Sequence, residues 1–312
     1  MSTQLLRSLN ALPAKAQGAI ATIGNFDGVH LGHQALIRAV LATAKEQGAP
    51  SLVITFEPHP AEFFAGSQLT VPRLTRFREK FLALAALQPD YVLFLPFNQK
   101  LANLTASEFV SQILVDALRI KQVIIGDDFR FGQKRQGDFT LLKQLGAAAE
   151  FGVQAMDTLE VAGARVSSTR IREALKVADL ALAQTLLGRP YTMQGRVRPG
   201  EKLGRQWGFP TANLFLHRRL TPVLGVFTVF MHGLAAKPLP GVANIGTRPT
   251  VNGTKTLLEV HLLDFNRDIY NHDVKVEFCH KLRDEVHYPN VELLKAQIAE
   301  DVRIARQYFE MN

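Results

Sequence analysis

The sequence is poor in cysteine and has no uninterrupted apolar run long enough to span a membrane. Cys279 is the only cysteine in 312 residues, which excludes an intrachain disulfide and a cysteine-cluster metal site. A lone cysteine fits a reducing compartment, and we expect Cys279 to pack within a strand. The most apolar stretch, residues 81–97, is interrupted by Gln-Pro-Asp at 88–90 and predicts a helix, a turn and a strand. Nothing before Gly24 resembles a signal peptide, so we expect a cytoplasmic protein with no membrane partner.

Acidic residues are in the minority. The chain has 36 Lys and Arg against 28 Asp and Glu, a formal net charge of +8 that favours anionic partners. Nucleic acid, acidic lipid and phosphorylated small molecules all satisfy this preference, and charge alone does not choose among them. Acidic residues are dispersed among the basic ones, and no long basic tail, internal repeat or low-complexity segment occurs. We therefore expect no nucleic-acid partner.

The length and the 47% hydrophobic content of the chain allow two domains with separate cores. Up to about residue 180, short apolar runs alternate with longer helical patterns, which predicts an α/β domain with a mainly parallel sheet. Strands are expected at residues 19–23, 52–56, 91–95, 123–125 and 153–156, and helices at residues 34–47, 76–87, 107–118 and 139–149. Thr105 and Glu108 have the spacing of a capping box before the third helix.

The pattern changes after Gly188-Arg189-Pro190. From residue 191 to about residue 278, shorter alternating segments are punctuated by glycine and proline, which predicts an antiparallel barrel or sandwich. Residues 291–309 carry apolar side chains at helical spacing and should close this domain as an amphipathic helix. We therefore place one domain at residues 1–186 and a second at residues 187–312.

A glycine-rich motif follows the first expected strand. Residues 24–33 read Gly-Asn-Phe-Asp-Gly-Val-His-Leu-Gly-His, at the point where a parallel sheet presents ligands at the carboxyl ends of its strands. The glycines let the backbone approach a phosphate. His30 and His33 are three residues apart, which places them on one face beside the positive end of a helix. A lone histidine would more often be structural, but this pair in a strand-to-helix turn predicts a phosphate site.

This motif resembles the adenylyltransferase domain of the bacterial bifunctional riboflavin kinase/FAD synthetase family, within the wider HxGH nucleotidyltransferase superfamily. Residues 126–132, Gly-Asp-Asp-Phe-Arg-Phe-Gly, resemble the family's flavin-side loop, and residues 167–172, Ser-Ser-Thr-Arg-Ile-Arg, resemble its second ATP-binding motif. The resemblance implies a Rossmann-like first domain. It also implies attack by the FMN phosphate on the α-phosphorus of ATP, with alignment and charge stabilisation carrying catalysis.

The same resemblance implies roles for individual residues of the first domain. It implies that His30 and His33 are the catalytic residues and contact the ATP phosphates. The ATP site comprises Gly24, Phe26, Gly28, His30, Gly32, His33, Ser168, Thr169 and Arg172. Flavin contacts fall to Asp128, Phe129 and Arg130, although many family members have Asn in place of Asp128. A helix N-cap at Ser168 and Thr169 is the structural alternative, and it is compatible with phosphate binding.

Residues 204–213, Gly-Arg-Gln-Trp-Gly-Phe-Pro-Thr-Ala-Asn, resemble the riboflavin kinase domain of the same family. The run at residues 241–250, followed by Glu259, does so too. The resemblance implies an antiparallel β-barrel with a C-terminal helix that phosphorylates the ribityl 5′-hydroxyl of riboflavin. It also implies that Glu259 is the general base. The residues implied for ATP binding are Gly204, Pro210 and Thr211, and those implied for magnesium binding are Thr211 and Asn213.

Together the two domains imply a bifunctional enzyme that converts riboflavin to FMN and FMN to FAD. Mg²⁺ is the expected metal ion, and ATP, riboflavin, FMN and FAD are the expected substrates or products. Three departures from common family patterns remove no chemical group: Pro199 replaces His, Trp207 replaces a smaller apolar residue, and Asn271 replaces Gly. Asparagine tolerates the left-handed backbone that glycine often adopts.

Two other functions stay open. One is an HxGH adenylyl- or cytidylyltransferase for another phosphorylated acceptor, with a second domain that only binds flavin. Glu259 and residues 210–213 argue against it. The other is a basic RNA-binding or flavin-sensing regulator without turnover, which would bind nucleic acid with a steep salt dependence.

Overall fold

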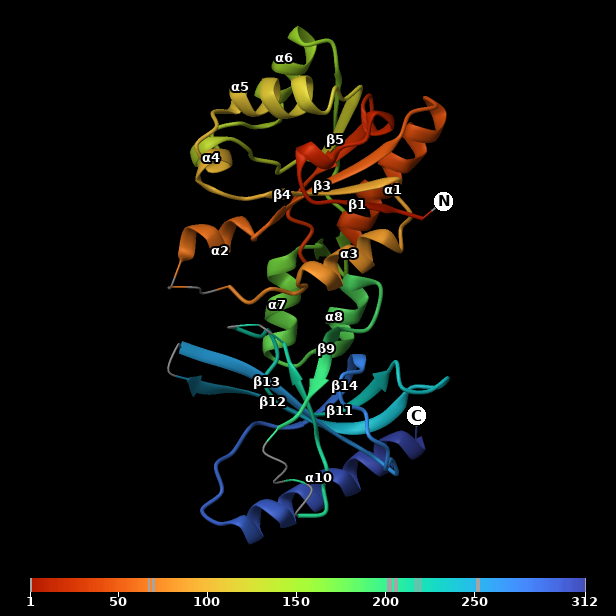
Figure 1. Cartoon of the computed structure of the whole chain (residues 1–312), viewed down its shortest axis with the longest axis vertical. Helices are drawn as coiled ribbons and strands as arrows, with labels where there is room; N and C mark the ends of the chain where they lie inside the picture. Colours follow the sequence, from red (N-terminus) through yellow and green to blue (C-terminus); the bar gives the residue numbers. More distant parts are fainter. Residues whose placement is uncertain are drawn as a thin grey trace. The chain divides into compact units, whose positions relative to one another are not determined.

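The computed structural model describes residues 2–66, 68, 71–200, 204, 207–216, 218, 220–250 and 253–311 (Figure 1). Side chains at residues 248–250 and 253–255 are outside this description. The chain divides into two compact units, Met1–Val71 with Thr75–Ser168, and Pro72–Leu74 with Thr169–Asn312. No helix among the described residues combines the length and the apolar character needed to cross a membrane.

The first unit is built on a parallel six-stranded sheet of order β1-β4-β3-β2-β5-β6. Its strands are β1 (Gln4–Leu6), β2 (Ile20–Ile23), β3 (Ser51–Glu57), β4 (Tyr91–Pro96), β5 (Gln122–Gly126) and β6 (Gly152–Met156). From β2 the chain proceeds to β3 and β4 on one side, whereas β5 and β6 lie on the other. The strand order therefore reverses between β2 and β5, where open α/β sheets bind ligands.

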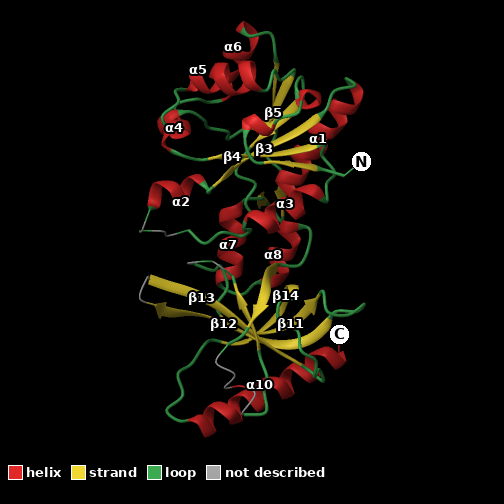
Figure 2. Cartoon of the chain, in the orientation of Figure 1, coloured by secondary structure: helices red, strands yellow, loops and turns green. Residues whose placement is uncertain are grey.

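Helices cover both faces of this sheet (Figure 2). They are α1 (Leu31–Glu46), α2 (Pro60–Ala65), α3 (Phe77–Ala85), α4 (Gln99–Ala102), α5 (Ala106–Phe109), the π-type helix η3 (Val110–Ala117) and α6 (Phe139–Ala148). Short 3-10 turns lie at η1 (Leu9–Ala11), η2 (Ala14–Ala16) and η4 (Gln133–Arg135), and a small hairpin joins β7 (Glu160–Val161) to β8 (Ala164–Arg165). Ile20 packs with α1 residues in one core, while Ala21 and Ile23 pack in the other with Phe109 and Leu142.

The predicted α/β domain is confirmed, with the five expected strands displaced by one residue at most at either end. The predicted capping box is confirmed too: Thr105 Oγ1 accepts from Glu108 N at 3.2 Å, and Glu108 Oε2 accepts from Thr105 N at 2.8 Å. The expected helix at residues 107–118 is two elements, because the α-helical turns of α5 give way to the π-type turns of η3.

The second unit is a closed antiparallel barrel of order β10-β13-β12-β11-β14-β9, which decides between the predicted barrel and sandwich. Its elements are α7 (Ser168–Lys176), α8 (Leu180–Leu187), β9 (Thr192–Arg198), β10 (Ala212–Phe215), β11 (Gly225–His232), β12 (Leu239–Thr250), β13 (Gly253–Leu262), β14 (Asp273–Arg283) and α10 (Val291–Met311). α7 begins at Ser168, the last residue assigned to the first unit.

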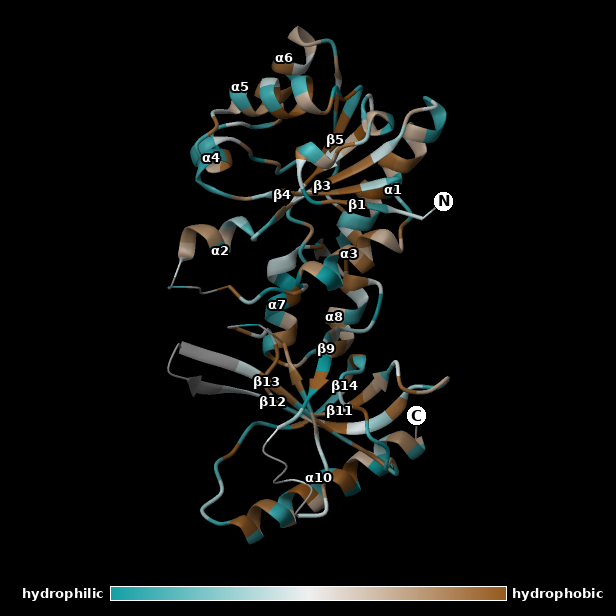
Figure 3. Cartoon of the chain, viewed as in Figure 1, coloured by the Kyte–Doolittle hydropathy of each residue, from teal (hydrophilic) through white to brown (hydrophobic). Residues whose placement is uncertain are grey.

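Side chains alternate across the barrel wall. On β13, Leu258 and Val260 are fully buried, so Leu257, Glu259 and His261 face the other way. The outer face packs on α10 through a cluster of Val226, Val242, Leu263 and Ala305. Brown and teal residues alternate along α10 in Figure 3, as the predicted amphipathic helix requires. The barrel thus keeps a packed interior and leaves an outer wall for a site.

Candidate functional site

The loop between β2 and α1, here called the histidine loop, ends at His30, and His33 lies against it in the first turn of α1. His30 is the N-cap of α1, and its Nδ1 accepts a hydrogen bond from His33 N at 3.3 Å. The two rings stack with their centroids 3.5 Å apart and an interplanar angle of 18°. Both imidazoles therefore lie at a helix N-terminus, where backbone N–H groups and the helix dipole favour an anion.

Two glycines of the motif make room for aromatic rings. A Cβ on Gly32 would lie 3.3 Å from atoms of the His30 ring, and a Cβ on Gly24 would lie 3.1 Å from the Phe26 ring. Phe26 is fully buried at a φ of 46°, with its ring edge on to His33 at 5.1 Å between centroids. Close packing against these rings therefore favours glycine at both positions.

Asp27 and Gly28 are attached to Thr75, which precedes α3. Thr75 N and Oγ1 donate to Asp27 Oδ1 at 2.9 and 3.1 Å, and Gly28 N donates to Thr75 Oγ1 at 3.0 Å. Gly28 has a φ of 86°, the region that favours glycine. Ser168 Oγ donates to the Asp27 carbonyl at 2.9 Å, so the structure brings the start of the second predicted ATP motif to the first.

The rest of the second motif lies on α7. Ser168 and Thr169 are the first two residues of this helix, and Thr169 is exposed there. The Nε of Arg172 donates to the Pro72 carbonyl at 2.7 Å. Ser168 therefore lies inside the first turn of α7 and is not its N-cap, the structural alternative predicted from the sequence.

His33 is held neutral at pH 7. Its own burial, followed by the charges of His30 and Lys80, lowers the pKa of His33 well below its usual value. Part of the residue remains accessible, but its Nδ1 is buried and has no hydrogen-bond partner among the described residues. This leaves one buried polar atom of the histidine pair without a described hydrogen bond.

Lys80, on α3, is a site residue that the sequence did not reveal. It is fully buried, and its Nζ donates to the Asn25 carbonyl at 2.7 Å and to Thr55 Oγ1 at 3.4 Å. In the sequence it follows Arg76 and Arg78, a pattern typical of a solvated basic face. No local signal distinguishes a buried lysine in such a setting.

The predicted flavin loop follows β5, the strand paired with β2, and so starts at the same sheet edge as the histidine loop. Asp128 forms an ion pair with Arg165 at 2.5 Å. The Phe129 ring stacks on Phe131 with centroids 5.5 Å apart. Arg130 is exposed, and its NH1 donates to the Phe129 carbonyl at 3.0 Å.

A second aromatic cluster at this edge was not predicted. Phe63, Phe64 and Phe97 make mutual edge-to-face contacts at 5.3–5.7 Å, and Phe56 joins through Phe97. These residues follow or end β3 and β4, and Phe64 is 69% exposed. The available signal was a Phe-Phe pair after an expected strand, and an aromatic surface of this kind suits a planar ligand.

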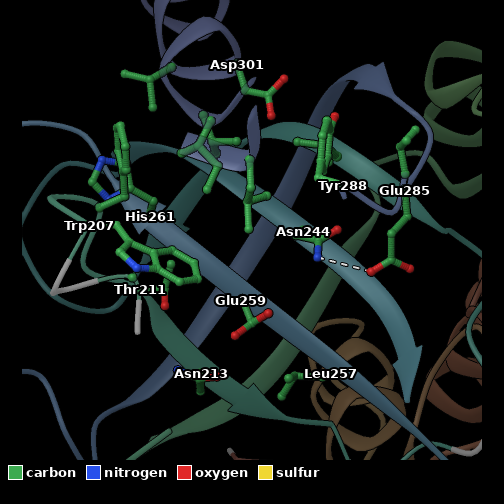
Figure 4. A pocket seen from close by; sticks show the side chains of 18 of the residues that line it. Trp207, Thr211, Asn213, Asn244, Leu257, Glu259, His261, Glu285, Tyr288 and Asp301 are labelled. Carbon is green, nitrogen blue, oxygen red and sulfur yellow. Dashed lines mark hydrogen bonds between the residues drawn. The ribbon is translucent and has the colours of Figure 1, made fainter. Parts of the chain in front are cut away.

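In the second unit, a cavity of about 670 Å³ lies on the outer wall of the barrel (Figure 4). The strands β10 to β13, the loop before β10, the end of β14 with the segment after it, and one side of α10 all contribute to its lining. The predicted residues Gly204, Thr211, Asn213 and Glu259 all line it, with Trp207 beside them. The structure thus brings together residues separated by up to 55 positions in the sequence.

Glu259 lies between two asparagines across the sheet. Asn213 on β10 and Asn244 on β12 are its directly paired neighbours. Figure 4 shows the Glu259 side chain near the middle of the site, with Thr211 and Asn213 toward one side and Asn244 toward the other. Paired residues on one face of a sheet have Cβ atoms about 4.5–5.5 Å apart. The side-chain oxygens of Glu259 and the two asparagines can therefore bind the same ligand.

The turn before β10 is set by close backbone packing. Phe209 N donates to the Gly204 carbonyl at 2.8 Å, and a Cβ on Gly204 would overlap the Phe209 carbonyl. His261 Nδ1 donates to the Pro210 carbonyl at 2.9 Å and fixes the turn to β13. Arg205 and Gln206 of the predicted motif lie outside the described residues.

Asn213 is held in a similar way. It is 8% exposed, and a Cβ on Gly200 would overlap its side-chain amide. Asn271 adopts a φ of 65°, which confirms the left-handed backbone expected where glycine is frequent. Pro199 is exposed, whereas Trp207 lines the cavity.

A second cavity, of about 440 Å³, adjoins the same turn. Pro210, Thr211 and Ala212 form one side of it, and residues 265–270 form another. Thr211 lines both cavities, and Pro210 lines only the smaller of the two. The predicted Pro-Thr-Ala-Asn segment therefore separates two spaces of ligand size.

Asn244 and Glu285 are further residues of the larger cavity without a predicted role. Asn244 Nδ2 donates to Glu285 Oε1 at 3.4 Å, while the buried Asn244 Oδ1 has no hydrogen-bond partner within the described ranges. A Cβ on Gly246 would overlap the Glu285 carboxylate. The sequence resemblance covers Asn244 only as part of the run at residues 241–250 and implies no separate role for it.

The two units correspond to two known families. The FAD synthetase family model matches residues 12–170, and the riboflavin kinase family model matches residues 187–309. The chain belongs to the bifunctional riboflavin kinase/FMN adenylyltransferase family. The proteins of that name from Escherichia coli K12 and Pseudomonas fluorescens are 47% and 48% identical to it, over 98% and 97% of both chains.

A solved structure agrees over the full length. The crystal structure named as a macrolide-efflux protein from Streptococcus pneumoniae has a TM-score of 0.80 and 29% identity, over 98% of this chain and 99% of that one. Its name describes a transport function, which neither family model nor the curated relatives share.

Proposed function

We propose an assignment of individual residues to the two activities of this family. The chain phosphorylates riboflavin with ATP to give FMN, and it transfers an adenylyl group from ATP to FMN to give FAD and pyrophosphate. Both reactions take ATP, and the two motifs that resemble ATP sites lie in separate compact units. We therefore assign a separate nucleotide site to each activity.

For the kinase, the larger cavity takes riboflavin and the smaller one takes the nucleoside part of ATP. The observation that supports this is Thr211, which lines both cavities, with Glu259 in the larger one. A phosphoryl group reaching past Thr211 would meet a hydroxyl positioned by Glu259. Glu259 acts as the general base, and Gly204 and Pro210 shape the ATP side.

Magnesium is part of this proposal. Thr211 and Asn213 offer a hydroxyl and an amide oxygen, the hard donors that Mg²⁺ prefers. Among the described residues, no group of three or more His, Cys, Asp or Glu side chains is clustered for a metal ion. Phosphate oxygens and water would supply most of the coordination, and the ion would neutralise charge on the transferred phosphate.

For the adenylyltransferase, His30, His33 and the N-terminus of α1 bind the ATP phosphates, with Ser168, Thr169 and Arg172 on the pyrophosphate side. The stacked rings and their place at the helix N-terminus support this assignment. Gly24, Gly28, Gly32 and the buried Phe26 serve the ATP site by shaping this loop. The phosphate of FMN attacks the α-phosphorus, so the residues align and stabilise charge instead of attacking.

The flavin of the first site is assigned to the edge formed after β3, β4 and β5. Asp128, Phe129 and Arg130 contribute from the loop after β5, and the exposed Phe64 contributes an aromatic face. An isoalloxazine ring stacks well on such side chains. Asp128 contacts the flavin either while it is paired with Arg165 or after this ion pair breaks.

We further propose that the boundary between the activities lies at residues 186 and 187. Small-molecule flavins and ATP are the partners in this proposal, with no nucleic acid and no membrane. The lone cysteine favours a cytoplasmic location.

One assay tests the assignment as a whole. Purified protein is incubated with riboflavin, ATP and Mg²⁺, and FMN and FAD are resolved by chromatography over time. FMN should appear first and FAD should follow. FMN without FAD, at saturating ATP and FMN, would contradict the assignment of the first site.

A further inference from the structure

The histidine loop is attached at two points, to Thr75 just before α3 and to Lys80 within α3. Thr75 bonds Asp27 and Gly28, as described above, and Lys80, one turn into α3, donates to the Asn25 carbonyl at 2.7 Å. The same carbonyl accepts from Thr55 Oγ1 at 3.2 Å. The residue between these attachments is Phe26, whose strained φ and ring contact with His33 require a fixed backbone.

A fully buried lysine such as Lys80 is energetically unfavourable in itself. Lysine is almost never fully buried unless it is paired, and removing an ammonium group from water costs several kcal/mol. Two of the oxygens that Lys80 bonds, the Asn25 carbonyl and the Thr55 hydroxyl, are neutral, and its Nζ lies 5.9 Å from the centre of the Phe94 ring. Lys80 therefore places its ammonium group behind the backbone of residues 24–28, the loop to which the ATP phosphates are assigned.

We propose that Lys80 is a positioning residue for adenylyl transfer, a buried cation that fixes residues 24–28 and draws the ATP polyphosphate onto the stacked histidines. This inference rests on the proposed assignment of His30 and His33 to the ATP phosphates. Lys80 itself lies behind the backbone, bonded to the Asn25 carbonyl, and acts through the loop and through its field.

The field of Lys80 acts on His33. Burial, the charge of His30 and the charge of Lys80 lower the pKa of His33, while the carboxylate of Asp27 on the same loop is bonded to Thr75. A bound polyphosphate adds negative charge and raises that pKa, so ATP binding is coupled to proton uptake. Affinity for ATP at this site should therefore increase as pH falls toward the pKa of His33 in the free enzyme, and then level off.

Three substitutions separate the two contributions of Lys80. Lys80→Met removes the charge and the hydrogen bond, Lys80→Gln keeps a donor without charge, and Lys80→Arg keeps both. A hydrogen bond from a charged group is worth about 1.5–3 kcal/mol, so kcat/KM for ATP in FAD formation should fall about 10- to 100-fold in Lys80→Met. The riboflavin kinase activity of the same chain, with its own ATP site, should stay within about twofold, since no part of the kinase site changes.

Histidine-ring NMR of the full chain gives a readout that a merely structural role would not move. The titration midpoint of His33 should rise in Lys80→Met and Lys80→Gln, because one cause of its lowering is gone, and should remain in place in Lys80→Arg. The pH at which kcat/KM for ATP levels off should rise with it. If Lys80→Met does not fold, Lys80→Gln decides.

Wild-type FAD synthesis in Lys80→Met, or an unmoved His33 titration in Lys80→Gln, would overturn the inference. His33→Ala distinguishes this failure from a failure of the proposed site. Normal FAD synthesis in His33→Ala would remove the histidine assignment itself. Loss in His33→Ala together with normal synthesis in Lys80→Met would remove only the role of Lys80.

Discussion

Arg283 at the end of β14 donates from Nε and NH2 to both carboxylate oxygens of Asp301 on α10, at 2.8–3.1 Å. Asp301 is 3% exposed, and both residues line the larger cavity. Removing one partner of a buried pair leaves an uncompensated charge. The pair therefore connects the stability of α10 to the shape of the cavity.

Asp301→Ala should lower the free energy of unfolding by about 2–3 kcal/mol, less than for a fully buried pair because Arg283 is partly exposed. Urea denaturation measures this change, and the KM for riboflavin should rise. Glu300→Ala is the matched control, because it breaks the exposed pair with Arg303 on the same helix. Equal effects of the two substitutions would show that the buried pair has no special role.

His30→Ala combined with His33→Ala should abolish FAD formation from FMN and leave riboflavin phosphorylation nearly intact. Both rings lie at the N-terminus of α1, in the first unit only. The two activities are measured separately by chromatography on the same folded preparation. Equal loss of both activities would contradict the assignment.

Glu259→Gln should have the reverse selectivity. The amide keeps the shape of the side chain but cannot accept the hydroxyl proton, and general-base catalysis contributes about 10²- to 10⁴-fold. The kinase kcat should fall by that order, while added FMN is still converted to FAD. Kinase turnover within about threefold of wild type would remove Glu259 from this role.

Thr211→Ala should raise the magnesium concentration needed for half-maximal kinase activity, because it deletes one oxygen donor from the proposed metal site. A magnesium titration at saturating riboflavin checks this. Thr192→Ala on β9 is a suitable control, since Thr192 lines neither cavity. An unchanged magnesium requirement in Thr211→Ala would argue for a purely structural threonine.

A fragment of residues 169–312 should fold and convert riboflavin to FMN without making FAD. It keeps α8, whose Ala183, Leu186 and Leu187 are buried, whereas a fragment beginning at residue 184 cuts this helix. Both fragments lack Pro72–Leu74, and the fragment of residues 169–312 therefore loses the hydrogen bond from Arg172 to the Pro72 carbonyl. The longer fragment should therefore unfold at a lower temperature than the kinase unit of the whole chain. A folded but inactive fragment, rescued by the N-terminal half, would show that the active site is shared.

Periodic patterns made most of the fold predictable. Alternation at residues 225–230 and 257–262 indicated strands on a half-buried surface, and the structure confirms β11 and β13 there. β1 was missed because three residues carry too little pattern. The π-type turns of η3 were also missed, since their apolar residues fit an α-helical period almost as well.

The candidate site was predictable only where a motif names its residues. Glu259, Thr211 and Asn213 were found by resemblance, and the barrel places them along one cavity. Asn244 could not be inferred, because its position beside Glu259 depends on the pairing of β12 with β13. The burial of Lys80 depends on how α3 packs on the sheet, which no local pattern encodes.

The alternation along β13 gives its two sets of side chains separate tasks. Leu258 and Val260 fill the barrel, whereas Leu257 and His261 flank the Glu259 carboxylate on the outer wall. Residues that line the cavity therefore alternate along β13 with residues that form the interior of the barrel. Either set can vary while the other stays constant. Substitutions at every second residue of β13 could therefore reshape the cavity and leave the interior unchanged. A single-residue insertion in this strand would exchange the two sets and destroy both at once.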